Sequence, residues 1–268
     1  MARVAYLDCF SGVSGDMLLG AVIDAGIPVE DLRAELNRLP LDGYGLSATR
    51  VKRAGIAATH ACVDVRGEAA PRTLADVLQV IEASSLPAVD RQKGVAVFQR
   101  LAEAEASVHG DTVETVHLHD VGAIDAIVDV MGAISGLRLL GAERVYCSPL
   151  PLGDGEVPGP HGTLPVPAPA TLELVRRASA PVRAVSASGE LVTPTGAAIV
   201  TTLASFTRPE MTIGQVGYGA GSRDPEGRPN VLRLWIGEAA EAHTRPMLLI
   251  ETNIDDMTGE ILAYVHEK

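Results

Sequence analysis

Hydrophobic and polar positions in the first half of the chain follow two periods, that of a strand and that of a helix. Residues 4–10 form an apolar run that predicts a buried strand, and the apolar stretch 17–25 predicts a helix after the small-residue turn 11–16. Two alternating segments, 45–52 and 57–65, predict a hairpin. The same criteria predict further helices at 29–39, 73–84, 88–108 and 121–140, an extended segment at 113–119 and a strand at 144–147.

The second half opens with a region rich in proline and glycine. Between residues 148 and 169 these two residue types are too frequent to predict regular structure, which indicates a functional loop or a domain boundary, and we favour the loop. Beyond it the pattern predicts helices at 168–177 and 195–204, strands at 182–186, 211–217 and 231–236, and finally a strand at 247–253 and an uncapped helix from 256 to 268.

Strands that alternate with helices predict an α/β protein with mixed sheets and packed helices. We expect two subdomains, 1–147 and 148–245, followed by the start of a C-terminal domain at 246–268. The hydrophobic share of 47% contains only 3% aromatic residues, so Ala, Val, Leu and Ile must build the core.

The formal charge of −12 argues against non-specific binding to nucleic acid or to an anionic membrane, because both need clustered Lys and Arg. A cation suits this chain, whereas an anionic substrate needs a local site that works against the overall charge. Three widely spaced cysteines predict neither a disulfide framework nor a paired zinc motif. Without a signal core or an apolar run long enough to span a bilayer, we expect a cytoplasmic protein.

The segment around His117 and His119 is the strongest candidate for metal chemistry. In an extended chain, residues two apart point to the same side, so the two imidazoles would form a ligand pair. Asp120 follows directly, and Asp125 and Asp129 lie four apart on one face of the next predicted helix. The alternative is that both histidines are exposed strand residues and that Asp120 caps the helix. Spacing alone leaves these interpretations evenly balanced.

A third metal ligand is needed, and His161 in the proline-rich region is one candidate. The prolines on both sides stiffen the backbone that would present its imidazole, although a turn residue beside Gly162 is the simpler interpretation. The remaining histidines have no comparable neighbours in the sequence: His60, His109, His243 and His266.

Two helix starts are candidate anion sites. The turn with Ser14, Gly15 and Asp16 resembles phosphate-binding loops, but it lacks the P-loop, dinucleotide and nucleophile-elbow spacings, and Asp16 would more naturally hold a metal. Near Glu190, a second start with Thr195 and Gly196 could accept a phosphate or carboxylate. For both, helix capping is the plain alternative.

A glycine-rich stretch at 217–221 is equally ambiguous. Its glycines could let the backbone approach a ligand, or they could simply turn the chain.

Several longer segments resemble one known family. They are Tyr6-Leu7-Asp8-Cys9-Phe10-Ser11-Gly12-Val13-Ser14-Gly15-Asp16-Met17, the stretch 117–129, His161-Gly162-Thr163-Leu164-Pro165-Val166-Pro167-Ala168-Pro169-Ala170, Thr193-Pro194-Thr195-Gly196-Ala197 and Asn253-Ile254-Asp255-Asp256-Met257. In order along essentially the whole chain, they look like the LarC family, the nickel-insertion proteins of nickel-pincer cofactor biosynthesis.

The resemblance implies an enzyme, a nickel chelatase of the lyase class. Such proteins insert nickel into pyridinium-3,5-bisthiocarboxylic acid mononucleotide in a reaction that needs CTP with Mg or Mn, and the product serves lactate racemase. The implied partners are this nucleotide and either the lactate racemase apoprotein or a separate C-terminal half, and we expect a homo-oligomer.

With nickel as the expected metal, residue chemistry suggests roles that the family pattern itself does not supply. The residues expected to hold nickel are His117, His119 and His161, assisted by Asp8, Asp16 and Asp125. Those expected to receive the substrate phosphate are Ser14, Gly15, Thr195 and Gly196.

Two departures limit what the resemblance implies. Asp120 stands where the family pattern leads us to expect Glu, which shortens the reach of the carboxylate by one methylene. Family members also continue well past residue 260, and the CTP site is expected in that later domain, so this chain alone is expected to bind nickel or substrate without completing the reaction. Two alternatives stay open: a non-catalytic nickel-binding or storage module, and a metal-dependent phosphoester hydrolase that uses a bound water.

Overall fold

The computed structural model describes residues 1–66, 72–118, 122–159, 162–225 and 227–239. At its centre lies a seven-stranded mixed sheet with the strand order β11-β6-β1-β13-β12-β3-β2. In chain order these strands are β1 (Ala2–Asp8), β2 (Tyr44–Arg53), β3 (Ile56–Val65), β6 (Arg144–Cys147), β11 (Ala204–Ser205), β12 (Met211–Ala220) and β13 (Val231–Ala239). The predicted α/β class with a mixed sheet is confirmed.

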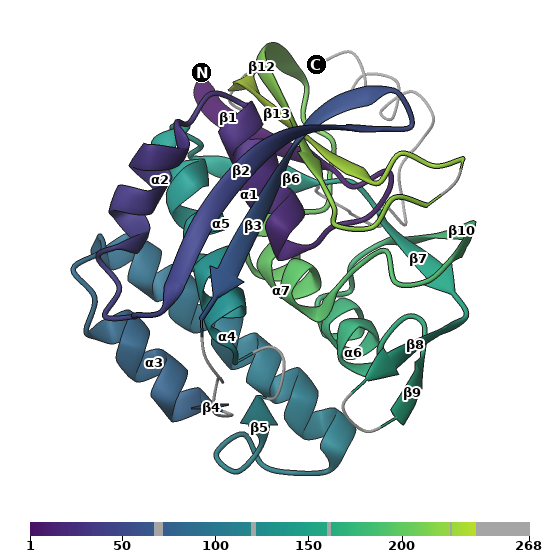
Figure 1. The fold of residues 1–268 in the computed structure, drawn as a ribbon. Helices are drawn as coiled ribbons and strands as arrows, with labels where there is room; N and C mark the ends of the chain where they lie inside the picture. Colours follow the sequence, from purple (N-terminus) through teal and green to yellow (C-terminus); the bar gives the residue numbers. More distant parts are fainter. Residues whose placement is uncertain (67–71, 119–121, 160–161, 226, 240–268) are drawn as a thin grey trace, which may run out of the picture.

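The helices form two layers beneath the sheet (Figure 1). Helix α1 packs on β12, β3 and α5, and the long helix α4 packs on the far side, against α3, α5, α6 and α7. Their bounds are α1 (Gly15–Asp24), α2 (Val29–Leu36), α3 (Leu74–Glu82), α4 (Ala88–His109), α5 (Ile124–Leu139), α6 (Pro169–Arg177) and α7 (Pro194–Leu203). Buried Ala, Val, Leu and Ile from all these layers form the main core, as the composition predicts.

The glycines of β12 bring α1 close to the sheet. A Cβ atom on Gly217 or Gly219 would overlap the backbone of α1, at Ala21 and Met17 respectively. The sequence suggested a ligand-binding or turning role for these glycines. Both instead lie inside a strand, where the lack of a side chain lets the helix approach.

The proline-rich region contains regular structure, which corrects the expectation of an irregular loop. It holds β7 (Leu150–Asp154) and the hairpin of β8 (Glu156–Gly159) and β9 (Gly162–Pro165). Strand β7 pairs with β10 (Val182–Ser188). Proline removes one donor from a ladder, and these two-stranded sheets tolerate the loss because each strand is an edge strand.

The extended segment predicted at 113–119 is mostly a turn. Only β5 (His117–Leu118) is a strand, and it pairs with the equally short β4 (Arg72–Thr73). Pro87 precedes α4, whose predicted span of 88–108 ends within one residue of the observed His109.

The seven-stranded sheet takes strands from both sides of the boundary predicted at residue 148, since β1 is hydrogen-bonded to β6 on one side and to β13 on the other. The strand and helix predicted at 247–253 and 256–268 lie outside the described residues.

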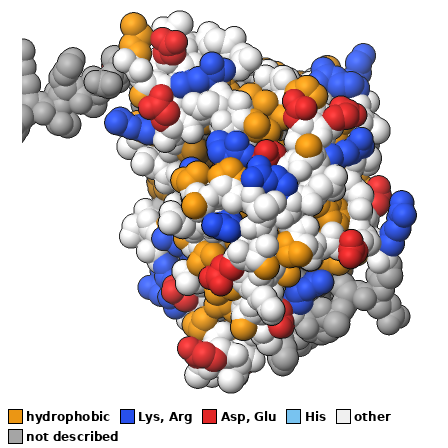
Figure 2. All heavy atoms as spheres, turned by 90° about the vertical axis from the view of Figure 1, so that its left-hand side faces the viewer, with side chains coloured by type: hydrophobic (Ala, Val, Ile, Leu, Met, Phe, Trp, Pro, Cys, Tyr) orange, Lys and Arg blue, Asp and Glu red, His pale blue; other side chains and the backbone are white. Residues whose placement is uncertain are grey.

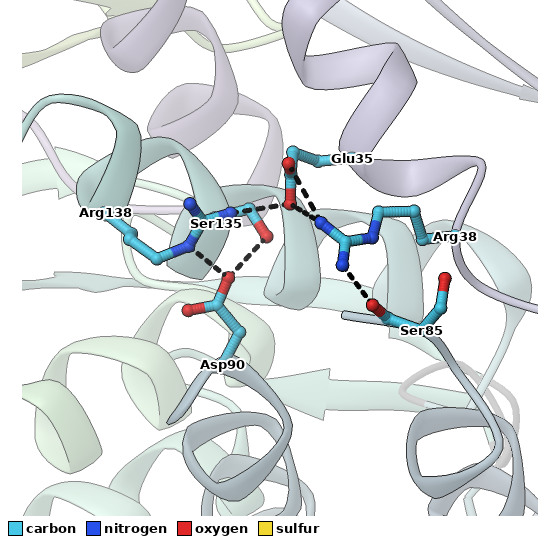
Figure 3. A network of polar contacts seen from close by, with 6 residues as sticks. All are labelled: Glu35, Arg38, Ser85, Asp90, Ser135 and Arg138. Carbon is cyan, nitrogen blue, oxygen red and sulfur yellow. Dashed lines mark hydrogen bonds and ion pairs between the residues drawn. The ribbon is translucent and has the colours of Figure 1, made fainter. Parts of the chain in front are cut away.

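A polar network clamps three helices together beside the core (Figure 3). Arg138 of α5 donates from Nη2 to Oε2 of Glu35 on α2, at 2.6 Å, and from Nε to Oδ2 of Asp90 on α4, at 2.8 Å. Ser135 also donates to Asp90, and Arg38 pairs with Glu35 at 3.2 Å. Burial alone would lower the pKa of Arg138, but the hydrogen bonds and charges of Asp90 and Glu35 outweigh burial and raise it. The guanidinium therefore stays charged and pairs with both acids, and Arg38 supplies the second positive charge.

Figure 2 shows the side of the molecule that carries α2 and α3. Acidic and basic side chains are interspersed there with small hydrophobic areas, so this face offers no extended patch of one sign. Among the described residues, no helix combines the length and hydropathy needed to cross a membrane.

Candidate functional site

A cavity of about 570 Å³ lies where several helices begin. The first residues of α1, α5, α6 and α7 reach its wall, together with β3, the end of α4 and the β8–β9 hairpin. Its polar and charged lining residues are Ser14, Asp16, His60, Cys62, Glu105, His109, Asp125, Asp129, Glu190, Thr193, Thr195 and Ser222. Because helix N-termini carry partial positive charge, this arrangement favours carboxylates at the cavity.

The cavity brings together several residues that the sequence singled out separately. Ser14, Gly15 and Asp16 come from the start of α1, Asp125 from the start of α5, and Thr195 from the start of α7. Along the chain, the start of α5 lies 109 residues after that of α1, and the start of α7 lies 70 residues after that of α5, so their meeting is a property of the fold.

Three carboxylates form the acidic end of the cavity: Asp16, Asp125 and Asp129. Residues 125 and 129 lie four apart on α5, which places both on one helix face. Asp16 accepts a hydrogen bond from the Ser14 hydroxyl and another from its neighbouring backbone N–H at Met17, at 2.9 Å. In the part of the chain that the structure describes, no Lys or Arg forms an ion pair with any of the three.

Asp129 is the deepest member of this acidic cluster. Its Oδ1 atom is buried without a hydrogen-bond partner, and its Oδ2 atom packs directly over the Cα of Gly15, where any Cβ would overlap it. Burial raises the pKa of Asp129 well above its usual range, and the nearby charges of Asp16 and Asp125 raise it further. A divalent cation would reverse this effect, because it stabilises all three ionised carboxylates at once.

A histidine and a cysteine of β3 belong to the cavity lining. His60 and Cys62 are two apart on this strand, so their side chains point to the same side of the sheet. Burial raises the pKa of Cys62. The charge of Asp64 raises it further, and so does the hydrogen bond that the Cys62 thiol donates to this carboxylate, at 3.6 Å. The charges of Asp16 and Asp129 act in the same direction. These effects hold Cys62 as a neutral thiol.

His109 reaches the cavity from the C-terminal end of α4. Its Nε2 atom lies 3.5 Å from Oε2 of Glu105, one helical turn earlier. The sequence gave His60 and His109 no comparable neighbours, and the structure places both on the wall of this cavity together with the acids. The available signals were the two-residue spacing of His60 and Cys62 and the four-residue spacing of Glu105 and His109, but nothing local linked either pair to Asp16.

The other two cysteines lie in the core. Cys9 and Cys147 are buried with their Sγ atoms 3.5 Å apart, and neither lines the cavity. The mutual hydrogen bond, followed by burial, raises the pKa of Cys9 well above its usual range. Both thiols therefore behave as small hydrophobic side chains.

The predicted histidine ligands fall largely outside what the structure describes. His119 and His161 lie outside the described residues, and of His117 only the backbone, in β5, is described. Among the described side chains no three of the types His, Cys, Asp and Glu converge tightly enough to hold a metal ion. The three-histidine ligand set stays a prediction.

Asp8 lies at the end of β1 and is not part of the cavity wall. Its carboxylate is paired with the guanidinium of Arg233 on the neighbouring strand β13, with Nε at 3.0 Å from Oδ2. An acid that is already paired with arginine is a poor first choice for a metal ligand.

The start of α7 is capped internally. The Thr193 hydroxyl accepts from the backbone N–H of Gly196 at 3.1 Å, and Gly196 packs against the carbonyl of Val13, away from the cavity lining. That N–H is therefore already used, whereas Thr195 stays on the wall. Nearby, burial raises the pKa of Glu190, and the charge of Arg223 opposes this in part.

Comparisons with known proteins give a consistent result. The sequence model of a family described as "Nickel insertion protein" matches residues 5–268. Relatives named for nickel insertion are 50% identical in Roseiflexus castenholzii, 48% in Geotalea daltonii and 50% in Thermomicrobium roseum. The alignments cover 98%, 99% and 97% of this chain but 68%, 69% and 65% of the respective relatives. No solved structure matches the chain.

Proposed function

Because the chain belongs to the nickel insertion protein family, we propose that its cavity holds Ni(II) for transfer to pyridinium-3,5-bisthiocarboxylic acid mononucleotide. The observation that carries this proposal is the acidic cluster of Asp16, Asp125 and Asp129, which has no basic partner among the described residues. These three acids do not converge tightly enough to form a closed metal site on their own, but they lack a counter-charge among the described residues, and a divalent cation can supply it.

Nickel binding in this proposal is shared between hard and softer donors. The three carboxylates attract the cation, and the imidazoles of His60 and His109 lie on the same cavity wall. The predicted ligands His117, His119 and His161 would complete the set from the neighbouring segments. Mixed oxygen and nitrogen donors hold Ni(II) firmly enough to collect it, yet the sulfur atoms of the substrate can still remove it.

The cavity chemistry also suits the incoming substrate. Formation of a bond between nickel and a ring carbon of the pyridinium requires that carbon to lose its proton, and a carboxylate on the cavity wall can accept it. Glu190 lies on that wall with its pKa raised by burial, which makes it a better proton acceptor than an ordinary surface acid. Ser14, Gly15 and Thr195 remain the predicted contacts for the nucleotide, and all three line the cavity.

CTP with Mg or Mn, and the delivery of the product to lactate racemase, belong to the same proposal and are supported by family resemblance alone. The relatives extend beyond the part that this chain covers. We place the CTP-dependent step in that additional part, so that this chain holds nickel and substrate while turnover needs the longer protein.

Crystals of the protein soaked with Ni(II) test the proposal through anomalous scattering at the nickel edge. We expect the strongest peak between Asp16 and Asp129, and a peak at a surface histidine alone would contradict the proposal. A protein of full family length, given the thiolated pyridinium mononucleotide, Ni(II) and CTP, should form the nickelated cofactor. Nickel binding without any nucleotide binding would instead favour a storage module, and hydrolysis of simple phosphate esters would favour the hydrolase.

A further inference from the structure

Two arginine side chains converge on the loop that follows β1. Arg228 donates from Nη2 to the carbonyl oxygen of Phe10, at 2.7 Å, and from Nε to the hydroxyl of Ser11, at 2.9 Å. Arg183, from β10, donates to the same carbonyl oxygen of Phe10. The shared acceptor holds the two guanidinium groups next to each other, although like charges repel.

Two further arginines extend this group along the sheet. Arg233 lies with its guanidinium carbon 5.2 Å from the ring centre of Phe10 and 5.6 Å from that of Trp235. The guanidinium carbon of Arg208 also lies over the ring of Trp235, 5.1 Å from its centre. Among the described residues, one of these four arginines forms an ion pair with a carboxylate, namely Arg233 with Asp8. These four arginines thus gather positive charge in a chain whose net charge is −12.

The charge of Arg183 and Arg228 is not neutralised. Burial lowers the pKa of Arg228, and the charge of Arg183 lowers it further. In the described part of the chain, their only hydrogen bonds are those to Phe10 and Ser11, which use two N–H groups of Arg228 and one of Arg183. Since a guanidinium carries five N–H donors, most of the donors of this pair remain for another acceptor.

We propose that Arg183 and Arg228, the latter held by the buried hydroxyl of Ser11, form a binding site for the phosphate group of a mononucleotide. Planar guanidinium groups donate two parallel hydrogen bonds to the oxygens of a phosphate, and a dianion removes the repulsion between them. This pair supplies the local positive site that an anionic substrate needs in an otherwise acidic protein.

The phosphate site lies beside the cavity. The loop from Ser11 to Ser14 spans three residues, so the two Cα atoms are at most ~11 Å apart, and Ser14 lines the cavity. Another arginine, Arg223, donates from Nη2 to the carbonyl oxygen of Glu190, at 3.0 Å. Glu190 also lines the cavity. A mononucleotide can therefore place its ring in the cavity and its phosphate at the arginines. That this ligand is the nickel acceptor rests on the function proposed above, whereas binding of a phosphate monoester does not.

Calorimetry without nickel tests the site, with nicotinic acid mononucleotide as the probe, since it combines a pyridinium carboxylate with one phosphate. The corresponding riboside, which lacks the phosphate, should bind at least about tenfold more weakly. Arg183→Gln, an exposed position, and Arg228→Gln should each weaken binding of the mononucleotide about tenfold, and added salt should narrow the difference.

Arg91→Gln is the matched control. Arg91 also donates to two backbone carbonyls, of Glu82 and Ser84, but in the described part of the chain it shares neither acceptor with another arginine. Its substitution should leave mononucleotide binding unchanged, and the melting temperature of each variant reports its folding. Equal binding by Arg183→Gln and Arg91→Gln would overturn the site. Tighter binding of CTP than of the mononucleotide, lost in the same variants, would overturn its assignment to a phosphate monoester.

The same proteins separate this inference from the proposed function. Arg183→Gln should keep its nickel affinity, because Arg183 is not part of the cavity wall. A wild-type protein that binds the mononucleotide but not nickel would contradict the proposed function and leave the phosphate site standing.

Discussion

Two groups of acids meet at helix α5, and they differ in what lies next to them. Near its C-terminal end, Asp90 and Glu35 meet Arg138, which donates to both (Figure 3). Near its N-terminal end, Asp129 meets only Asp16 and Asp125. Both Asp90 and Asp129 keep one oxygen buried without a hydrogen-bond partner, so burial alone does not distinguish the groups.

The difference lies in the counter-charge. Where the chain supplies its own arginine, the acids join helices and their role is structural. Where it supplies none among the described residues, the acids line the 570 Å³ cavity, and in the proposed function a bound cation supplies the counter-charge. On this account, the lack of a counter-charge is a better guide to the proposed nickel site than the number of acids alone.

Removing the arginine should produce the largest change in stability. Arg138→Met leaves the fully buried Asp90 without its cation, and we expect the free energy of unfolding to fall by about 3 kcal/mol. Urea denaturation measures this. The control Arg176→Met removes an exposed pair with Glu173 and should cost less than about 1 kcal/mol. Similar losses in the two variants would mean that the network in Figure 3 does not stabilise the fold.

A methyl group on Gly15 should displace the side chain of Asp129 and so disturb the acidic cluster. In Gly15→Ala the new Cβ overlaps Asp129, which must move, and we expect a loss of about 1–3 kcal/mol together with weaker nickel binding. Gly45→Ala adds a methyl group where no atom lies within 4 Å, and it should change stability by less than about 0.5 kcal/mol. Equal behaviour of the two variants would show that Asp129 has room to move.

The pH dependence of stability should carry the opposite sign from that of an ordinary acid in an ion pair. The folded pKa of Asp129 is raised above the unfolded value of about 3.9, so without nickel the contribution of Asp129 to stability is complete below that value. This contribution is lost as the pH rises through the raised folded pKa. Asp129→Asn should remove this loss, which we expect to be at least about 1 kcal/mol. Parallel pH profiles of unfolding for the two proteins, measured with a chelator present, would contradict the pKa shift.

Much of the fold could be predicted from local patterns. Helix α4 has the expected bounds because Pro87 starts it and the left-handed Gly110 ends it. The proline-rich hairpin β8–β9 could not be predicted in the same way, since it depends on pairing between edge strands. The short length of β5 likewise depends on its partner β4, since Thr73 pairs with His117, 44 residues later in the sequence, and Arg72 pairs with Leu118.

The candidate site was predictable only in parts. Asp16 and Asp125 were recognised from their own helix starts, but the approach of Asp129 to Gly15 depends on the packing of α1 against α5. His60 was missed because a strand 44 residues beyond Asp16 gives no local sign that it will face the same cavity. The arginines around Phe10 come from three separate segments, so the sequence suggested glycine loops for the phosphate instead.

Nickel affinity of Asp129→Asn tests the central claim most directly. The substitution keeps the shape of the side chain and removes one buried charge from the cluster, and Asp31→Asn, on the exposed first turn of α2, is the control. By calorimetry at pH 7, we expect Asp129→Asn to bind Ni(II) about 10–100-fold more weakly than the wild type, with unchanged affinity for Asp31→Asn. Wild-type affinity in Asp129→Asn would contradict the claim that this acidic cluster holds the nickel.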